Sequence, residues 1–505
     1  MKLKKILQNS VMETIFYLII AVVGLLKVKY IIHGLGSEMN GYYQFINNII
    51  SYIVLAEAGI STAILYKMYR PVANNDYKKI SELFNGSKAI LKGIGIIFIS
   101  IAVILLPVIY MYTKEIKLFI TISFCFFMLV FAVALPYLSG TRSYTTLLTA
   151  DQKRFTYGLV YNISRLLTDI LIIFVVSLTN SIISIVIVNL LFKILETLVI
   201  TSYCKKKYTY LDKSATPDKS AKKMSGDMIF HQVGYVIFNN VDTVLLMSFL
   251  GPVYVSIYSS YNYIVTFIRE LFDKNNQMIS NIFGYSFAKD DKKTLDYYKS
   301  YVSFFSAVTL VISFCFVMGA RSFIKLWIDK PNYILNYLSS CSFAAIIVSN
   351  IILTNINTVI QANGLFKESR FFPIIESVVN IILSIILLKL IGINGILIAT
   401  FIASLVGIFI RTNLINKNVF KKASYKSLII RPIIVILSFV LLSIVLFPLE
   451  SKVLLFSTNY FKWFLVMLVI FIIVLLVIFS VFYLFDHAMR NNFKVILNKV
   501  RRTHE

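Results

Sequence analysis

The chain has 505 residues, of which 58% are hydrophobic and only 15% are charged, and its mean hydropathy is +0.79. Soluble domains contain about 45–50% apolar and about 25% charged residues, so this composition excludes an ordinary soluble protein and indicates lipid as the solvent. The net charge of +26 is carried largely by short loops between apolar stretches, as in membrane proteins, so no nucleic-acid binding is expected.

Fourteen stretches are long and apolar enough to cross a bilayer, which takes about 20 residues in a helix. Backbone polar groups cannot stay unpaired in hydrocarbon, so these stretches are predicted to be helices. In chain order they are expected at 10–33, 43–66, 89–112, 117–138, 157–178, 181–202, 227–250, 253–273, 299–320, 333–358, 371–390, 394–415, 428–448 and 461–485. The predicted fold class is an all-α polytopic membrane protein with about 14 transmembrane helices.

Lysine and arginine are divided unevenly between the two sets of loops. With the N-terminus inside, the inner segments hold about 34 of these residues and the outer segments about 10, which predicts that both termini are cytoplasmic. The MKLKK start lacks a small-residue cleavage site, so the first apolar run is interpreted as an uncleaved span. The wealth of Ile, Lys and Asn is typical of an AT-rich bacterial genome, so the expected location is a bacterial plasma (inner) membrane.

Sequence motifs for catalysis are absent. The chain has no Walker A, HExxH, CxxC or GxSxG motif, and its four cysteines lack the paired spacing of a disulfide framework or zinc site. All expected outer loops are short, whereas a membrane glycosyltransferase or polysaccharide polymerase would usually need a sizeable one. We therefore expect no enzyme, no metal and no cofactor.

One phrase recurs about 215 residues along the chain. Leu35-Gly36 aligns with Leu250-Gly251, and the alignment then pairs Tyr43 with Tyr258, Asn47 with Asn262 and Ser51 with Thr266. An even number of spans separates the copies, so they predict two pseudo-symmetric six-helix halves of parallel topology, followed by two additional helices. The expected boundaries are 1–210, 211–420 and 421–505, and a binding cavity is expected between the halves near the midplane.

Ionisable residues at membrane depth are costly and usually face a cavity or one another. Arg165 and Asp169 are four residues apart on one helix face, so they are expected to pair, either as a structural pair or as a substrate contact. Lys193 and Glu196, three apart, have the same two interpretations. Glu57 has no local partner in the sequence.

The repeat alignment also matches Asp242 with Lys27, so opposite charges would occupy equivalent positions in the two halves. Carboxylates cannot reach far toward water, which makes Glu57 and Asp242 candidate functional groups. Arginines can extend toward an interface instead, and this is the expectation for Arg411 and Arg431.

Two further polar features bear on function. The intramembrane asparagines are expected either to join helices by hydrogen bonds or to line the cavity; they include Asn47, Asn48, Asn239, Asn240 and Asn262. The segment 74–84 is interpreted as an amphipathic helix on the inner membrane surface, with Tyr77, Ile80, Leu83 and Phe84 facing the lipid.

Three stretches together resemble a known family. The run KYIIHGLGSEMNGYYQFINNIISYIVLAEAGISTAILYKMY, the loop TADQKRF at 149–155 and NNVDTVLLMSFLGPVYVSIYS resemble polysaccharide flippases of the Wzx type. These flippases belong to the multidrug/oligosaccharidyl-lipid/polysaccharide exporter superfamily. The resemblance covers nearly the whole chain, and its loose motifs identify the superfamily better than the substrate.

The resemblance implies a helical bundle that moves an oligosaccharide, linked through pyrophosphate to undecaprenol, from the inner to the outer leaflet by alternating access. It implies Lys27, Arg165 and Lys193 as contacts for the anionic headgroup, and the asparagines as contacts for the sugar. Glu57, Asp169 and Asp242 become candidates for gating or for coupling to H+ or Na+. Membrane lipids, a polysaccharide polymerase and glycosyltransferases are the implied partners, and a monomer is expected because the cavity lies within one chain.

Three alternatives remain open at this point. A lipid II or teichoic-acid flippase would differ only in the headgroup carried. A multidrug or cation antiporter of the same superfamily usually has 12 spans, which the additional pair at 428–485 argues against. A membrane glycosyltransferase or polymerase belongs to another class of protein and is disfavoured by the short outer loops.

Overall fold

The computed structural model describes residues 2–57, 59–220, 226–288, 294–420 and 425–490, and across these ranges the chain is helical with no β-strand. The predicted all-α class is thus confirmed. The chain divides into two compact units, Met1–Tyr258 and Ser259–Glu505. Each unit is described by itself, and the predicted boundaries after residues 210 and 420 stay predictions.

The first unit contains nine α-helices and the start of a tenth in the described ranges. They are α1 (Lys2–Ile53), α2 (Ile60–Ala73), α3 (Tyr77–Ile104), α4 (Leu106–Thr113), α5 (Ile116–Leu138), α6 (Thr141–Ala150), α7 (Arg154–Thr179), α8 (Ile182–Lys207) and α9 (Gly226–Phe249), with a 3-10 turn η1 (Val54–Glu57) after α1. α10 (Pro252–Ala288) begins here and continues into the second unit.

The second unit holds the remaining elements of the described chain. They are α11 (Thr294–Ile328), a 3-10 turn η3 (Pro331–Tyr333), α12 (Tyr337–Ala362), α13 (Phe366–Ser369), α14 (Phe372–Ile391), α15 (Ile393–Asn418), α16 (Tyr425–Phe456) and α17 (Tyr460–Phe485).

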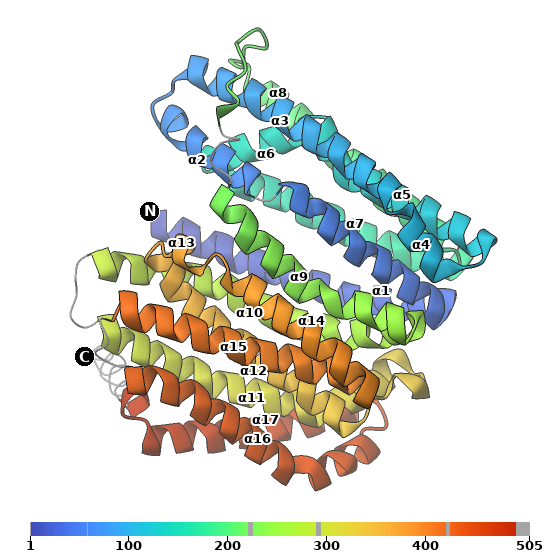
Figure 1. The fold of residues 1–505 in the computed structure, drawn as a ribbon, viewed down its shortest axis with the longest axis vertical. Helices are drawn as coiled ribbons and strands as arrows, with labels where there is room; N and C mark the ends of the chain where they lie inside the picture. Colours follow the sequence, from blue (N-terminus) through green and yellow to red (C-terminus); the bar gives the residue numbers. More distant parts are fainter. Residues whose placement is uncertain (1, 58, 221–225, 289–293, 421–424, 491–505) are drawn as a thin grey trace. The chain divides into compact units, whose positions relative to one another are not determined.

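The same order of neighbouring helices occurs in both units. In the first, α7 packs on α8, α8 on α5, and α5 on α3 (Figure 1). In the second, α14 packs on α15, α15 on α12, and α12 on α11. Shifting the first set by the 215 residues of the sequence repeat brings each helix onto its counterpart in the second set. A duplication of one helical bundle accounts for this order.

Eleven segments of the described residues are long and apolar enough to cross a membrane. The first of them, Ile15–Glu57, includes most of the first expected span and the first part of the second, because α1 runs through Gly36 with only one non-helical residue. The second expected span, 43–66, is interrupted by the turn η1 and continues in α2. α9 and α10 coincide with the expected spans at 227–250 and 253–273 but are not among the eleven. The structure therefore has helix at each of the fourteen expected places, with the second expected span divided between α1 and α2.

The two copies of the repeated phrase touch each other within the first unit. Gly36 and Gly251 both have a positive φ, 84° and 87°, a region that favours glycine because it has no Cβ. The Asn40 amide donates a hydrogen bond of 2.6 Å to the Ser256 hydroxyl. A Cβ at Gly41 would overlap the backbone of Pro252, so only glycine allows this approach. The second half of α1 is thereby fixed against the start of α10.

The segment between α8 and α9 is attached along α3. The Asn85 amide donates to the carbonyls of Asp212 (3.0 Å) and Ala215 (2.9 Å), and Lys79 forms an ion pair of 3.0 Å with Asp218. A Cβ at Gly86 would overlap the Asp218 carbonyl, so the two backbones lie in direct contact. We call residues 208–220 the strap.

The strap and α6 cover the apolar face of α3 that is expected to meet lipid. Ile80, Leu83 and Phe84 are buried inside the protein, with the Phe84 ring 4.7 Å from that of Tyr144. Tyr77 stays exposed and lies 4.4 Å from the ring of Tyr210 in the strap. The expectation that this face enters the membrane is therefore wrong for these three buried residues, because protein covers them.

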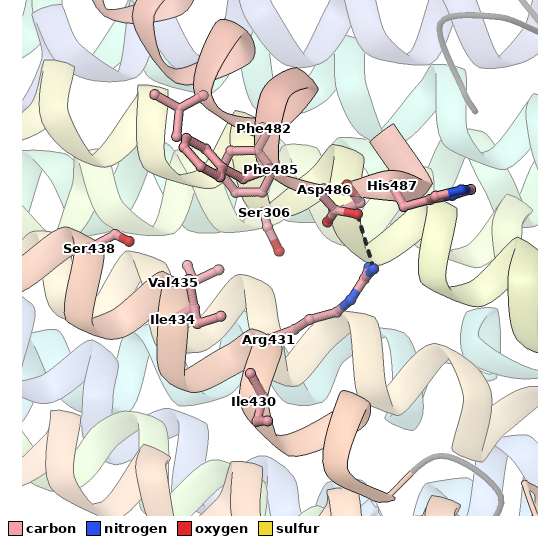
Figure 2. Close-up of a pocket in the computed structure, with 12 residues that line it drawn as sticks. Ser306, Ile430, Arg431, Ile434, Val435, Ser438, Phe482, Phe485, Asp486 and His487 are labelled. Carbon is pink, nitrogen blue, oxygen red and sulfur yellow. Dashed lines mark hydrogen bonds and ion pairs between the residues drawn. The ribbon is translucent and has the colours of Figure 1, made fainter. Parts of the chain in front are cut away.

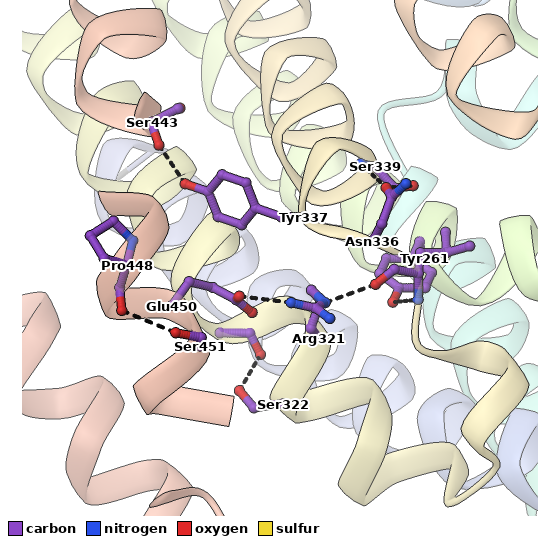
Figure 3. A network of polar contacts seen from close by, with 12 residues as sticks. Tyr261, Arg321, Ser322, Asn336, Tyr337, Ser339, Ser443, Pro448, Glu450 and Ser451 are labelled. Atoms are coloured by element: carbon purple, nitrogen blue, oxygen red, sulfur yellow. Dashed lines mark hydrogen bonds and ion pairs between the residues drawn. The ribbon is translucent and has the colours of Figure 1, made fainter. Parts of the chain in front are cut away.

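Charged pairs hold α16 near both of its ends. Near its start, Arg431 pairs with Asp486, the residue after α17, at 3.1 Å (Figure 2). Arg431 also donates to the Lys299 carbonyl at 2.7 Å. Near the end of α16, Glu450 accepts from Arg321 of α11 at 2.8 Å (Figure 3). Arg431 had been expected to extend toward an interface, but its guanidinium is engaged by these protein groups.

Candidate functional site

Glu57 lies at a break between helices in the first unit. α1 ends at Ile53, the 3-10 turn η1 carries Glu57, and α2 starts after Gly59, whose φ is 76°. The whole Glu57 residue is 7% exposed, so this carboxylate is buried despite lying in a turn. A buried carboxylate without partners would be strongly unfavourable, so its surroundings have to supply hydrogen-bond donors.

Three side chains supply those donors. Arg142 donates to Glu57 Oε1 through Nε (3.2 Å) and Nη2 (3.0 Å), while Tyr137 donates to Oε2 and Ser61 donates to Oε1. Tyr137 lies in the last turn of α5 and Arg142 in the first turn of α6, on either side of Gly140, whose φ is 80°. Two helix breaks thus bring a carboxylate, a guanidinium and a phenol together. We call this group the Glu57 cluster.

A second charged group continues from the Glu57 cluster across α7 and α8. Lys193 pairs with Glu196 at 2.9 Å, which confirms the pairing expected from their spacing. The Lys193 ammonium also lies 5.9 Å from the centre of the Tyr161 ring, within cation–π range. Tyr157 is within electrostatic reach of both Arg142 and Glu196.

Asp169 has a different partner from the one expected. Its Oδ1 pairs with Lys27 of α1 at 2.6 Å, whereas Arg165 is exposed. The expected Arg165–Asp169 pair is therefore wrong: one turn of helix separates the two residues, but a cation on the neighbouring helix reaches the buried carboxylate instead. Asp169 Oδ2 is buried with no hydrogen-bond partner among the described residues, so this carboxylate has capacity for another donor.

The asparagines separate into two kinds. Asn48 joins α1 to α9 by donating to Thr243 at 3.2 Å, which is the helix-joining role, and its own carbonyl oxygen is buried without a partner in the described structure. Asn47, Asn239 and Asn240 each donate to the carbonyl four residues earlier on their own helix. Asn262 is half-buried in the second unit.

Asp242 is buried at 3% exposure and accepts a 3.0 Å hydrogen bond from Tyr258. Lys27 and Asp242, which the repeat alignment makes equivalent, therefore both have a polar partner, but the partners differ. Lys27 pairs with a carboxylate, whereas Asp242 accepts a hydrogen bond from a phenol.

The second unit has its own buried ion pair. Arg411 of α15 donates through Nη1 and Nη2 to the two carboxylate oxygens of Glu376 on α14, and through Nε to Asn357 at 3.0 Å. Arg411 is 4% exposed, so the expectation that it extends to an interface is wrong. A Cβ at Gly407 would overlap the Glu376 carboxylate, so a glycine provides the space for this pair.

The main residue that the sequence reading missed is Arg142. It follows an apolar span closely and looks like an ordinary loop cation, so neither charge nor hydropathy distinguishes it from its neighbours. Two sequence features could have indicated the site. One is the helix break predicted by Pro136 and Gly140, and the other is the break predicted by Gly59 next to Glu57, a carboxylate without a partner in the sequence. Their proximity depends on the contact of α2 with α6, which the sequence does not specify.

Comparison with known proteins shows the fold. No protein-family model and no curated protein sequence matches the chain. A multidrug resistance MATE family transporter of the MOP superfamily, in an inward-facing conformation, matches with a TM-score of 0.66 at 14% identity, over 82% of this chain and 99% of that one.

The lipid II flippase MurJ in its inward closed conformation has the same TM-score, 0.66, at 18% identity, over 94% of this chain and 99% of that one. A MOP superfamily transporter from Pyrococcus furiosus matches at 0.58 and 13% identity, over 81% and 95%. The chain therefore has the fold of the MOP superfamily membrane transporters.

Proposed function

We propose that this protein is a Wzx-type flippase, which moves undecaprenyl-pyrophosphate-linked oligosaccharide from the inner to the outer leaflet by alternating access. The observation that carries the proposal is the likeness to a lipid II flippase over 94% of this chain, against 82% for the MATE family transporter. The match to the flippase therefore covers more of this chain than the match to the MATE family transporter does. The sequence resemblance then favours the polysaccharide branch.

The charges of the first unit supply a chemistry for the pyrophosphate. Arg142, Lys193 and Lys27 are each neutralised by a carboxylate, namely Glu57, Glu196 and Asp169. A pyrophosphate oxygen competes for the same donors, because a guanidinium binds phosphate in the same bidentate geometry as carboxylate. Substrate binding would then release the carboxylate, which becomes free to take up a proton.

This exchange of partners would couple lipid transport to the movement of protons. A released Glu57 that binds a proton no longer competes for Arg142, so the loaded state stays loaded; its deprotonation on the other side restores the ion pair and expels the headgroup. Glu57 and Asp169 thus serve as gating carboxylates, and Asn47, Asn48, Asn239, Asn240 and Asn262 as contacts for the sugar. Asp242 and Arg165 keep their proposed roles in gating and in headgroup binding.

The test is transport in proteoliposomes. Purified protein is reconstituted with undecaprenyl-pyrophosphate-linked oligosaccharide, and movement between leaflets is followed by a sugar-oxidising reagent that does not cross the membrane. We expect Arg142→Ala and Lys193→Ala to lower the initial rate about 10-fold or more, since a charge-assisted hydrogen bond contributes about 1.5–3 kcal/mol. Lys117, an exposed cation in the first turn of α5, provides the matched control: Lys117→Ala should keep the full rate.

Glu57→Gln separates binding from coupling. The amide keeps a hydrogen bond to Arg142 but cannot exchange a proton, so flipping should persist while its stimulation by an imposed proton gradient disappears.

Full-rate transport by Arg142→Ala, Lys193→Ala and Arg165→Ala would refute the headgroup proposal. Transport of small cations without lipid would instead indicate an antiporter, and surface accumulation of unpolymerised sugar on gene deletion would indicate a polymerase. Genes for glycosyltransferases and a polymerase near this one would support the proposal.

A further inference from the structure

A cavity of about 540 Å³ lies in the second unit between α11, α16 and α17. Its volume falls within the range of about 300–1,000 Å³ that is typical of small-molecule sites. Figure 2 shows its two kinds of wall: Arg431, Asp486 and His487 at one end, and Ile434, Val435 and Phe482 at the other. A ligand for this cavity is therefore amphiphilic.

The polar end presents a cation and an anion side by side. Arg431 Nη2 lies 3.1 Å from Asp486 Oδ1, and both side chains are about one-fifth exposed, so a ligand can reach them. Asp486 Oδ1 also accepts the Ala488 N–H at 2.8 Å. Ser303 also lines the cavity; it is 1% exposed, and its hydroxyl has no hydrogen-bond partner in the described part of the chain. This end has spare polar capacity but little net charge.

The apolar end is continuous with a lipid-facing surface. α17 is apolar almost throughout and only Ile478 of it is buried, which indicates that lipid covers most of this helix. Ile434 and Val481 line the cavity and are each about half exposed. An acyl chain can therefore enter the cavity sideways from the bilayer.

We propose that this cavity binds the headgroup and upper acyl chains of one resident phosphatidylethanolamine-type phospholipid. Its phosphate contacts Arg431 and His487, and its primary ammonium donates to Asp486. A zwitterion matches both partners at once, whereas a purely anionic headgroup places its charge beside Asp486 without compensation. The expected cytoplasmic position of the C-terminus assigns this lipid to the inner leaflet. The proposal is independent of which substrate the protein carries.

Binding is measured on the purified full-length protein by native mass spectrometry, with dioleoyl lipids added at matched concentrations. We expect phosphatidylethanolamine to bind about 10-fold more tightly than phosphatidylglycerol or phosphatidylcholine; the last has a methylated ammonium that cannot donate a hydrogen bond to Asp486. Asp486→Asn should remove the preference for phosphatidylethanolamine over phosphatidylglycerol, because it removes the repulsion between the Asp486 carboxylate and the anionic headgroup.

Cavity filling tests the position of the site without touching its charges. Ser438→Trp fills the cavity from α16 and should abolish tight phosphatidylethanolamine binding. Leu441→Trp, one turn along the same helix and exposed outside the cavity, is the matched control and should bind normally. Equal binding of the three lipids, or undiminished binding by Ser438→Trp, would overturn the proposal. Displacement of the lipid by the undecaprenyl chain of the substrate would overturn it too.

Discussion

Several charged side chains in the apolar helices of the described chain form ion pairs, and three of these pairs join different elements. Lys27 of α1 pairs with Asp169 of α7, and Arg411 of α15 with Glu376 of α14. A buried ion pair rarely adds much stability over an apolar pair, because removing both ions from water costs nearly as much as their attraction returns. Removing one partner is different, since it leaves a single uncompensated charge.

The Glu376–Arg411 pair gives this argument its clearest test, because both residues are under 5% exposed. Arg411→Met alone should lower the free energy of unfolding by about 3–5 kcal/mol, and the double variant Arg411→Met, Glu376→Leu should recover most of that loss. Denaturation in detergent, followed by tryptophan fluorescence, measures both. A double variant as unstable as the single one would show that Asn357 and Gly407 leave no room for an apolar replacement.

At the scale of elements, several kinds of contact attach the strap to α3. Hydrogen bonds from Asn85, the Lys79 ion pair and the close approach at Gly86 all hold it to α3. The Ser220 hydroxyl and backbone N–H donate to Asp218, and together with Lys79 they hold the pKa of its carboxyl well below the ordinary value. The attachment of the strap to α3, outside the membrane, therefore depends in part on the charge of the Asp218 carboxylate.

The sign of that dependence follows from the lowered pKa. A carboxyl with a lowered folded-state pKa contributes stability above its unfolded pKa of about 3.9, and that contribution is lost as the pH falls below this value. Asp218→Asn should therefore speed amide exchange of residues 209–220 at pH 7 and have a shrinking effect as the pH falls below about 4.

Asn85→Ala should speed this exchange at every pH, roughly 5- to 10-fold for a lost hydrogen bond worth about 1 kcal/mol. Lys213→Ala is the control, because its side chain is exposed and only its backbone faces Asn85. The measurement is hydrogen–deuterium exchange by mass spectrometry. Unchanged exchange in Asn85→Ala would mean that the strap is held by its apolar contacts alone.

At the scale of the whole molecule, the fourteen expected crossings would put both chain ends on one side of the membrane. This predicts that Lys117 and Asn459 face outward, while Lys153 and Lys213 face the cytoplasm. Single cysteines at these positions, in a variant lacking the four native cysteines, can be tested with an impermeant maleimide on intact cells. Lys117→Cys and Asn459→Cys should be labelled directly, and Lys153→Cys and Lys213→Cys only after permeabilisation. The reverse pattern would invert the topology and the direction proposed for transport.

Helix positions were predictable from the sequence because lipid imposes one rule, a continuous apolar stretch, on every span. The repeat could also be read, since Gly36 and Gly251 carry a backbone requirement that keeps glycine at both places. Partners were harder to predict. Spacing found Lys193 with Glu196 on one helix, but Lys27 with Asp169 and Glu57 with Arg142 depend on which helices pack together.

The contact between the two LG turns has a consequence for how such a chain diverges after duplication. Gly41 and Ser256 are counterparts under the repeat alignment, yet exchanging them is not neutral: a serine at 41 would run into Pro252, and a glycine at 256 would remove the hydroxyl that accepts from Asn40. Two copies that touch at their own matching turns therefore need different residues there to keep both the close approach and the hydrogen bond. Two copies within one chain can carry such different residues, whereas a symmetric pair of identical chains could not.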